Sequence, residues 1–165
     1  MEIKILPDTN FYGLIIIDSA RKEIHEAIHK SSFLIFGFDV IRQELRNTSK
    51  SSSNLNRNLR IDLLNIYDDL VQKNYSLNDK ISKLAEDYFR VYREFGGNIS
   101  KEKMIPDFTI VACATIKQMD ILISDDKHSL LTENSLKTYK LVNELKGLVM
   151  PRFISYQEFK SIIMR

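Results

Sequence analysis

The chain has 165 residues, of which 44% are hydrophobic and 28% charged, a composition typical of one globular domain and unlike that of a disordered chain. Its net charge of +2 comes from 24 basic and 22 acidic residues, so overall charge predicts neither a nucleic-acid partner nor a membrane surface. The single cysteine, Cys113, excludes an intrachain disulfide and a cysteine-based zinc site and favours a reducing compartment. No apolar run approaches the ~20 residues of a membrane span, and we expect one cytoplasmic domain over residues 1–165.

Short apolar runs alternate with amphipathic stretches in the first part of the chain. The strand predicted first ends at Pro7, and the second is expected to break at Gly37. Residues 47–60 contain no acidic residue and predict an exposed loop that leads into a helix. The predicted strands cover residues 3–6 and 33–36, and the predicted helices cover residues 18–30 and 38–46.

Two longer amphipathic stretches follow. Their apolar stripes predict one helix over residues 59–74 and another over residues 79–95, which Gly96 and the next glycine end. Together they predict a helical hairpin at about residues 55–95. Its apolar stripes are able to supply a homodimer interface.

A buried helix is expected to open at Pro106, because proline is favoured in the first turn. Beyond it the sequence predicts a strand over 121–123, a turn over 124–126, a strand within 148–154 and a last helix over 156–163. Since short apolar strands alternate with helices, we predict a three-layer α/β/α sandwich with a central, mainly parallel sheet.

Four acidic residues occupy positions that an ordinary polar surface does not explain. Asp8 follows the first predicted strand, and Asp126 follows the strand predicted over residues 121–123. Parallel α/β sheets bind ligands at these ends of their strands. Glu44 lies on the apolar face of its helix, and Asp107 opens a helix with an apolar body. Because gathered, buried carboxylates are costly, they favour a hard divalent cation such as Mg²⁺ or Mn²⁺.

Each of these acids, taken alone, also has an ordinary structural explanation. Asp8 fits turn chemistry, Asp107 complements a helix dipole, Glu44 can pair with a neighbouring arginine, and Asp126 can belong to an exposed loop. The occurrence of all four at the strand ends of one sheet favours a shared site.

The motifs around these acids resemble those of PIN-domain nucleases. Leu6-Pro7-Asp8-Thr9-Asn10 resembles the first strand and Asp-Thr-Asn signature of that family. Asp107-Phe-Thr-Ile-Val-Ala-Cys-Ala114 resembles its Asp-initiated apolar helix, and Asp120-Ile-Leu-Ile-Ser-Asp-Asp126 resembles its strand followed by Ser/Thr-x-Asp. Glu44 matches the glutamate after the second strand. The four matches occur in the order of the family, between residues 6 and 127.

The resemblance implies a four-carboxylate centre that uses Mg²⁺ or Mn²⁺ to hydrolyse RNA phosphodiester bonds. Its catalytic and metal-binding residues would be Asp8, Glu44, Asp107 and Asp126. Asn10 and Ser124 would support the centre by hydrogen bonding, while Asp125 would stand beside it as an alternative ligand. Two positions depart from the family, because His128 and Ser129 stand where an acid and an aromatic residue are common.

RNA would need basic residues near these acids. The candidates are Arg42, Arg46, Lys50, Arg57 and Arg60. They are able to neutralise phosphates, in which case affinity falls with salt, or they form an ordinary solvated surface. Within the nuclease hypothesis the chain would be the toxin of a toxin–antitoxin pair, with an antitoxin partner, or an RNA-processing enzyme.

Two other functions stay open on the sequence. A PIN-like scaffold would bind RNA or a protein without cleaving. A haloacid-dehalogenase-like phosphatase also uses an aspartate after its first strand, but would want a second one where Asn10 stands.

One further motif is independent of the acids. His25-Glu-Ala-Ile-His29 fits the H-E-x-x-H pattern of zinc metalloproteases. On a helix these two histidines share one face, but the sequence offers no convincing third ligand.

Overall fold

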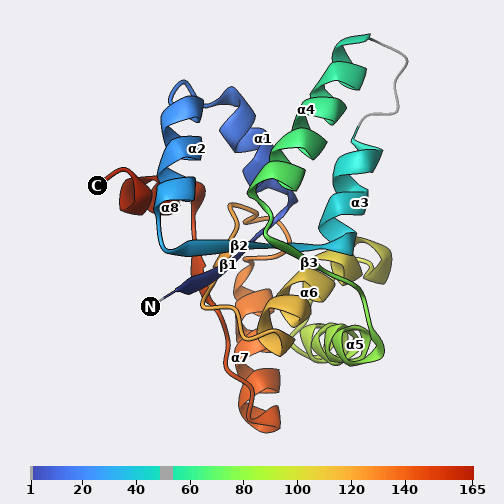
Figure 1. Ribbon diagram of the computed structural model, residues 1–165. Helices are drawn as coiled ribbons and strands as arrows, with labels where there is room; N and C mark the ends of the chain where they lie inside the picture. The colour runs from blue at the N-terminus through green and yellow to red at the C-terminus, as the bar shows by residue number, and fades with distance from the viewer. Residues whose placement is uncertain (1, 49–53) are drawn as a thin grey trace.

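The computed structural model describes residues 2–48 and 54–165 of the chain, with the side chains of residues 54–57 left aside. In this described part, five parallel strands form one sheet in the order β3-β2-β1-β4-β5 (Figure 1). The strands are β1 (Ile3–Pro7), β2 (Phe33–Phe38), β3 (Lys73–Tyr75), β4 (Ile121–Ile123) and β5 (Arg152–Ile154).

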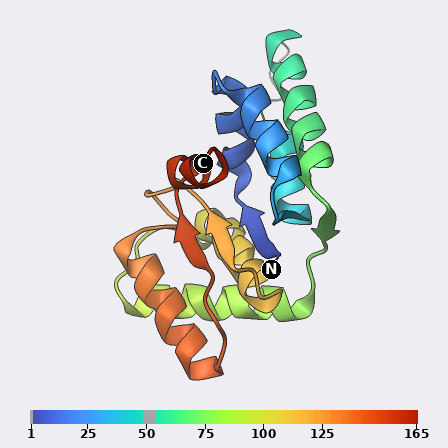
Figure 2. The ribbon, with the colours of Figure 1, turned by 60° about the vertical axis from the view of Figure 1, so that its left-hand side comes forward.

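Helices cover both faces of this sheet. The helices are α1 (Thr9–Ile17), α2 (Arg21–Lys30), α3 (Asp39–Asn47), α4 (Asn54–Leu70), α5 (Asp79–Glu94), α6 (Lys101–Ile116), α7 (Glu133–Lys146) and α8 (Tyr156–Ile163). Helix α4 packs against α1, α2 and α3, and α8 packs against α2, whereas α5 packs against α6 and α7 on the other face (Figures 1 and 2). The predicted three-layer α/β/α sandwich with a parallel sheet is confirmed.

The central strands are apolar because helices cover them on both sides. In β1, Ile5 and Leu6 are fully buried, and Ile5 pairs with Ile35 of β2 and Ile121 of β4. Strand β2 continues through Gly37, so the predicted break there is wrong. A Cβ at Gly37 would lie 2.1 Å from the Tyr67 hydroxyl oxygen, and glycine therefore permits the close approach of α4 rather than ending the strand.

The predicted helical hairpin over residues 55–95 does not form. Its two helices exist as α4 and α5, but α4 ends at Leu70 and the short strand β3 separates it from α5. The helices lie on opposite faces of the sheet (Figure 1). Most of each apolar stripe is buried within the chain, although Leu59 and Phe95 at their ends stay exposed. The homodimer interface expected of these stripes stays a prediction. The sequence analysis missed β3 because three mostly exposed residues carry almost no strand pattern.

Four helix assignments also change. Helix α1 was not predicted, because its sequence is apolar on nearly all sides and lacks an amphipathic period. The helix predicted over residues 18–30 begins at Arg21. Helix α6 begins at Lys101, so Pro106 lies inside it and Asp107 falls in its second turn instead of opening it. Helix α7, also unpredicted, is capped by the Thr132 side chain.

Cys113 is a free, buried thiol in α6. Among the described residues, no helix combines the length and the apolar character that a bilayer crossing requires.

Candidate functional site

The site begins where β1 ends. Asp8 directly follows β1 and is only 4% exposed, and its side chain caps α1 by accepting a hydrogen bond from the Phe11 amide at 3.3 Å. Because Pro7 pairs with Ile123 in the parallel register of β1 and β4, Asp8 lies beside Ser124. The Ser124 hydroxyl donates a hydrogen bond to the Asp8 carboxylate. Two neighbouring strands thus deliver an acid and its hydroxyl donor to the same sheet edge.

Glu44 comes from α3, which follows β2 on the other side of β1. It is half-buried, and its carboxylate accepts a hydrogen bond from the Thr9 hydroxyl at the start of α1. The neighbouring arginine does not neutralise it, since Arg42 forms an ion pair with Asp68 of α4 at 3.0 Å. The ordinary explanation of Glu44 as an arginine partner therefore does not hold for Arg42.

Ser129 joins the other two acids. Its hydroxyl oxygen lies 2.6 Å from a carboxylate oxygen of Asp126 and also contacts the carboxylate of Asp107. A serine hydroxyl has one hydrogen to donate, so it cannot donate to both carboxylates at once. A proton on Asp107 satisfies the second contact, and a bound cation would remove the need for it. Asp126 is held further by the amides of His128 and Ser129, at 2.9 and 3.1 Å.

The electrostatics show that these acids influence one another. Burial, together with the nearby charges of Asp126, Glu44 and Asp8, raises the pKa of Asp107 to about 7, although the hydrogen bond from Ser129 opposes the rise. Burial also raises the pKa of Asp8 to about 6, with a contribution from Asp126, and it raises the pKa of Glu44 despite the hydrogen bond from Thr9. The four carboxylates therefore form one electrostatically coupled cluster.

Asp126 is the exception in the cluster. Burial acts to raise its pKa, but the hydrogen bonds from the Ser129 hydroxyl and from the His128 and Ser129 amides outweigh burial, and the pKa is lowered. The cluster thus combines one ionised carboxylate with neighbours that hold their protons more tightly. A proton or a cation shared among them lowers the cost of bringing them together.

The donor set fits a hard cation. Within the described residues, no lysine or arginine forms an ion pair with any of the four carboxylates. Each carboxylate instead meets a serine or threonine hydroxyl, so the cluster presents oxygen ligands only. Oxygen ligands with excess negative charge suit Mg²⁺ or Mn²⁺.

Two residues expected to support the site take other positions. Asp125 is exposed, and its carboxylate accepts a hydrogen bond from the Tyr156 amide at 2.9 Å, at the start of α8. The Asp125 side chain therefore points to α8, while Asp126 shares the Ser129 hydroxyl with Asp107. The side chain of Asn10 is exposed, and only its backbone amide acts on Asp8, where its hydrogen bond lowers the pKa.

The basic residues are placed unevenly. Arg42 is committed to Asp68 through two hydrogen bonds, at 3.0 and 3.1 Å. Arg46 is exposed near the end of α3, and Arg60 is partly exposed on α4. Lys50 and the side chain of Arg57 lie outside the described residues. These positions leave the predicted RNA-binding surface untested.

The sequence analysis did not assign a role to Thr9 or to Ser129. Both are hydroxyl residues within three positions of a cluster acid, Thr9 next to Asp8 and Ser129 three residues after Asp126. That spacing matches local turns in which a carboxylate accepts amides two and three residues on, and it was the available signal for Ser129.

The similarity of this chain to known proteins lies in its structure and not in its sequence. No protein-family profile matches the sequence, and no curated protein matches it. In contrast, VapBC2 from Rickettsia felis, solved with a DNA fragment from its promoter, contains a chain that matches this one with a TM-score of 0.59 and 14% identity over 93% of this chain and 98% of that one.

Two further solved structures agree. VapBC-1 from nontypeable Haemophilus influenzae gives a TM-score of 0.59 at 15% identity, over 94% of this chain and 99% of that chain. VapBC-5 from Mycobacterium tuberculosis, a member of the VapBC family of toxin-antitoxin systems, gives a TM-score of 0.54 at 18% identity. The match covers 80% of this chain and 94% of that chain. Since these likenesses span nearly the whole chain and agree with its motifs, the protein has the PIN-domain fold.

Proposed function

We propose that this protein is a Mg²⁺- or Mn²⁺-dependent endoribonuclease whose catalytic and metal-binding residues are Asp8, Glu44, Asp107 and Asp126. The observation that carries the proposal is that Asp107 and Asp126 share the Ser129 hydroxyl, while Glu44 and Asp8 lie near enough to raise the pKa of Asp107. None of the four has a lysine or arginine partner among the described residues. Burial and three like charges raise the pKa of Asp107 to about 7. A divalent cation would offset the free-energy cost of ionising this carboxyl.

The side chains have separable roles in this proposal. A bound cation would lower the pKa of a water and stabilise charge that builds on the phosphate. The hydroxyls of Thr9, Ser124 and Ser129 fix the carboxylates that would hold the cation. Among the described residues, the sole cysteine is buried in α6, which leaves the acids as the best candidates for phosphodiester hydrolysis.

We further propose that the chain is the toxin of a toxin–antitoxin pair. The support is its likeness in fold to chains of three VapBC structures, one of them described as belonging to a family of toxin-antitoxin systems. The partners would then be RNA as substrate and an antitoxin protein. The toxin role predicts that expression without an antitoxin arrests growth, whereas an RNA-processing enzyme would not. The homodimer stays a prediction that sedimentation of the purified protein would check.

The test is cleavage of labelled RNA by purified protein with Mg²⁺, with Mn²⁺ and with a chelator. Asp8→Asn should abolish metal-dependent cleavage, and the melting temperature should stay the same or rise because a buried negative charge is removed. Asp125→Asn is the matched control, because Asp125 hydrogen-bonds to α8 and not to the cluster. It should cleave RNA at close to the normal rate.

Three outcomes would contradict the proposal. Normal cleavage by Asp8→Asn would remove the assigned centre. Binding of RNA with Mg²⁺ but no cleavage by the unaltered protein would favour a PIN-like scaffold. Hydrolysis of a phosphate monoester without RNA cleavage would favour the phosphatase alternative.

A further inference from the structure

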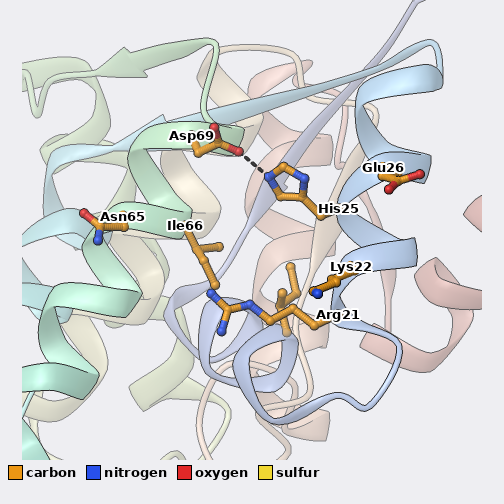
Figure 3. Close-up of a pocket in the computed structure, with 8 residues that line it drawn as sticks. Arg21, Lys22, His25, Glu26, Asn65, Ile66 and Asp69 are labelled. Atoms are coloured by element: carbon orange, nitrogen blue, oxygen red, sulfur yellow. Dashed lines mark hydrogen bonds and ion pairs between the residues drawn. The ribbon is translucent and has the colours of Figure 1, made fainter.

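A second group of candidate metal ligands lies between α2 and α4, away from the acid cluster. His25 and His29 are one helical turn apart on α2, and Asp69 of α4 contacts both. Figure 3 shows His25 and Asp69 facing each other between the two helices. The Nε2 atom of each histidine contacts the same carboxylate oxygen of Asp69, at 3.2 Å for His29. The ligand atoms of all three residues lie within 4.8 Å of one another. Folding thus supplies the third ligand that the H-E-x-x-H pattern lacked.

We propose that His25, His29 and Asp69 form a Zn²⁺ site that links α2 to α4. Two imidazole nitrogens and one carboxylate oxygen are a donor set that zinc prefers, and three protein ligands leave a fourth position for water. Zinc bonds of ~2.0–2.1 Å in a tetrahedron place neighbouring ligand atoms roughly 3.3 Å apart. The separation of 3.2 Å between His29 Nε2 and Asp69 Oδ2 is close to that spacing. His25 Nε2 is in direct hydrogen-bonding contact with the same oxygen, and the two atoms would move apart to admit an ion.

The surroundings allow an ion to enter. The side chains of His25, His29 and Asp69 are 39%, 48% and 51% exposed. His25 and Asp69 border an open cavity of about 450 Å³, which is also lined by Arg21, Lys22 and Asn65. The two imidazole rings lie edge to face with centroids 4.5 Å apart. Helical spacing places both rings on one face of α2, so the two imidazoles lie on the same side of the helix before an ion binds.

The site does not resemble a metalloprotease centre. The middle acid of the motif, Glu26, forms an ion pair with Lys30 at 3.3 Å and is 67% exposed. It is therefore not held beside the ligand atoms as a general base. The expected role of zinc is to join two helices that pack on the same face of the sheet, which would stabilise that face.

This inference does not depend on the nuclease proposal, because the two groups of ligands differ in chemistry. The acid cluster offers oxygen ligands that suit Mg²⁺, whereas the histidines favour Zn²⁺. Metal binding can therefore be measured with excess Mg²⁺ present, and in an Asp107→Asn background.

The experiment titrates ZnCl₂ into metal-free protein without a histidine tag, with excess Mg²⁺, by calorimetry. We expect one zinc per chain, retained in Asp107→Asn. His25→Ala and His29→Gln should each weaken binding more than about a hundredfold, beyond the roughly 10- to 100-fold cost of losing an outer-shell partner. Zinc should raise the melting temperature of the unaltered protein and leave that of His25→Ala unchanged.

Matched controls lie on the same two helices. Asp68→Asn removes the neighbouring carboxylate of α4, which pairs with Arg42, and Glu26→Gln removes the middle acid of the motif. Both should bind zinc as the unaltered protein does, and circular dichroism checks that every variant is folded. The proposal is overturned if the unaltered protein does not bind zinc, if His25→Ala and His29→Gln bind normally, or if binding is lost in Asp107→Asn.

Discussion

The acid cluster and the His25–His29–Asp69 cluster are two solutions to placing a carboxylate among potential metal ligands. In the first, Asp8 is 4% exposed and meets only hydroxyl and amide donors. In the second, Asp69 is 51% exposed and already contacts two imidazoles. The acid cluster therefore carries an electrostatic cost that a cation would relieve, while the Asp69 carboxylate is stable in its cluster without a cation.

This difference has a structural origin. The acid cluster is assembled where β2, β1 and β4 end side by side, so its residues come from distant parts of the sequence. The histidine cluster combines one helical turn of α2 with a residue of α4. Buried like charges are expected at functional sites more often than exposed, paired ones, and the expected effects of mutation follow that order.

The largest expected effect is on RNA cleavage. Glu44→Gln keeps the shape of the side chain but removes the charge that would hold a cation, and we expect metal-dependent cleavage to fall about a hundredfold or more. Glu26→Gln, which alters an exposed glutamate beside the histidine cluster, should cleave at the normal rate. Rates measured on one labelled RNA at saturating Mn²⁺ compare the two; equal rates would show that the acid cluster has no special role.

The second effect is on stability and its pH dependence. The pKa of Asp107 rises from 3.8 to about 7 on folding, so the folded state holds this proton more tightly than the unfolded state. Ionisation of Asp107 therefore destabilises the folded state. This loss of stability is absent below about pH 4, grows as pH rises and is complete above about pH 7. With a chelator present, Asp107→Asn should gain on the order of 2 kcal/mol relative to the unaltered protein at pH 8 and little at pH 4.

Urea unfolding at pH 4, 6 and 8 measures this gain. Asp68→Asn is the control, because it removes an exposed, paired carboxylate, and such pairs contribute within roughly 0–1 kcal/mol. If Asp107→Asn is destabilised at pH 8, Asp107 is not the costly buried charge inferred from its surroundings.

The third effect separates positioning from metal binding. Ser129→Ala removes the hydroxyl that lowers the pKa of both Asp107 and Asp126, so the pKa of each should rise. Cleavage at pH 7 should fall about tenfold, and the pH–rate profile should shift to higher pH. Ser129→Thr keeps the hydroxyl and should restore much of the rate. An unchanged profile in Ser129→Ala would show that the hydroxyl is structural only.

The smallest effect concerns RNA affinity. Arg46 is exposed in the last turn of α3, the helix that carries Glu44, and Arg46→Ala should weaken RNA binding a few-fold and reduce the salt slope by about one. Arg42→Ala should change that slope less, because Asp68 already neutralises Arg42. Binding titrations at several salt concentrations distinguish the two, and an unchanged slope in Arg46→Ala would remove Arg46 from the interface.

Much of the fold is readable along the chain. The apolar runs of β1, β2 and β4 are continuous because both faces of those strands are buried, and α5 and α8 end close to their predicted bounds. The elements that were missed lack such a local signal. Helix α1 is apolar all round, and β3 is short and mostly exposed. The hairpin was wrong because periodicity shows which face of a helix is buried but not against which partner.

The candidate site divides in the same way. The sequence by itself placed Asp8 and Asp126 at the ends of two strands, because parallel strands in one sheet end at a common edge. Glu44 and Asp107 were assigned from their positions on apolar helices and from the resemblance to PIN-domain nucleases. Only the tertiary structure decided that Asp126 and not Asp125 contacts the cluster, that Ser129 joins two acids, and that Asp69 completes the histidine pair. These are contacts between side chains of separate elements, and their distances depend on how helices pack, which local spacing does not encode.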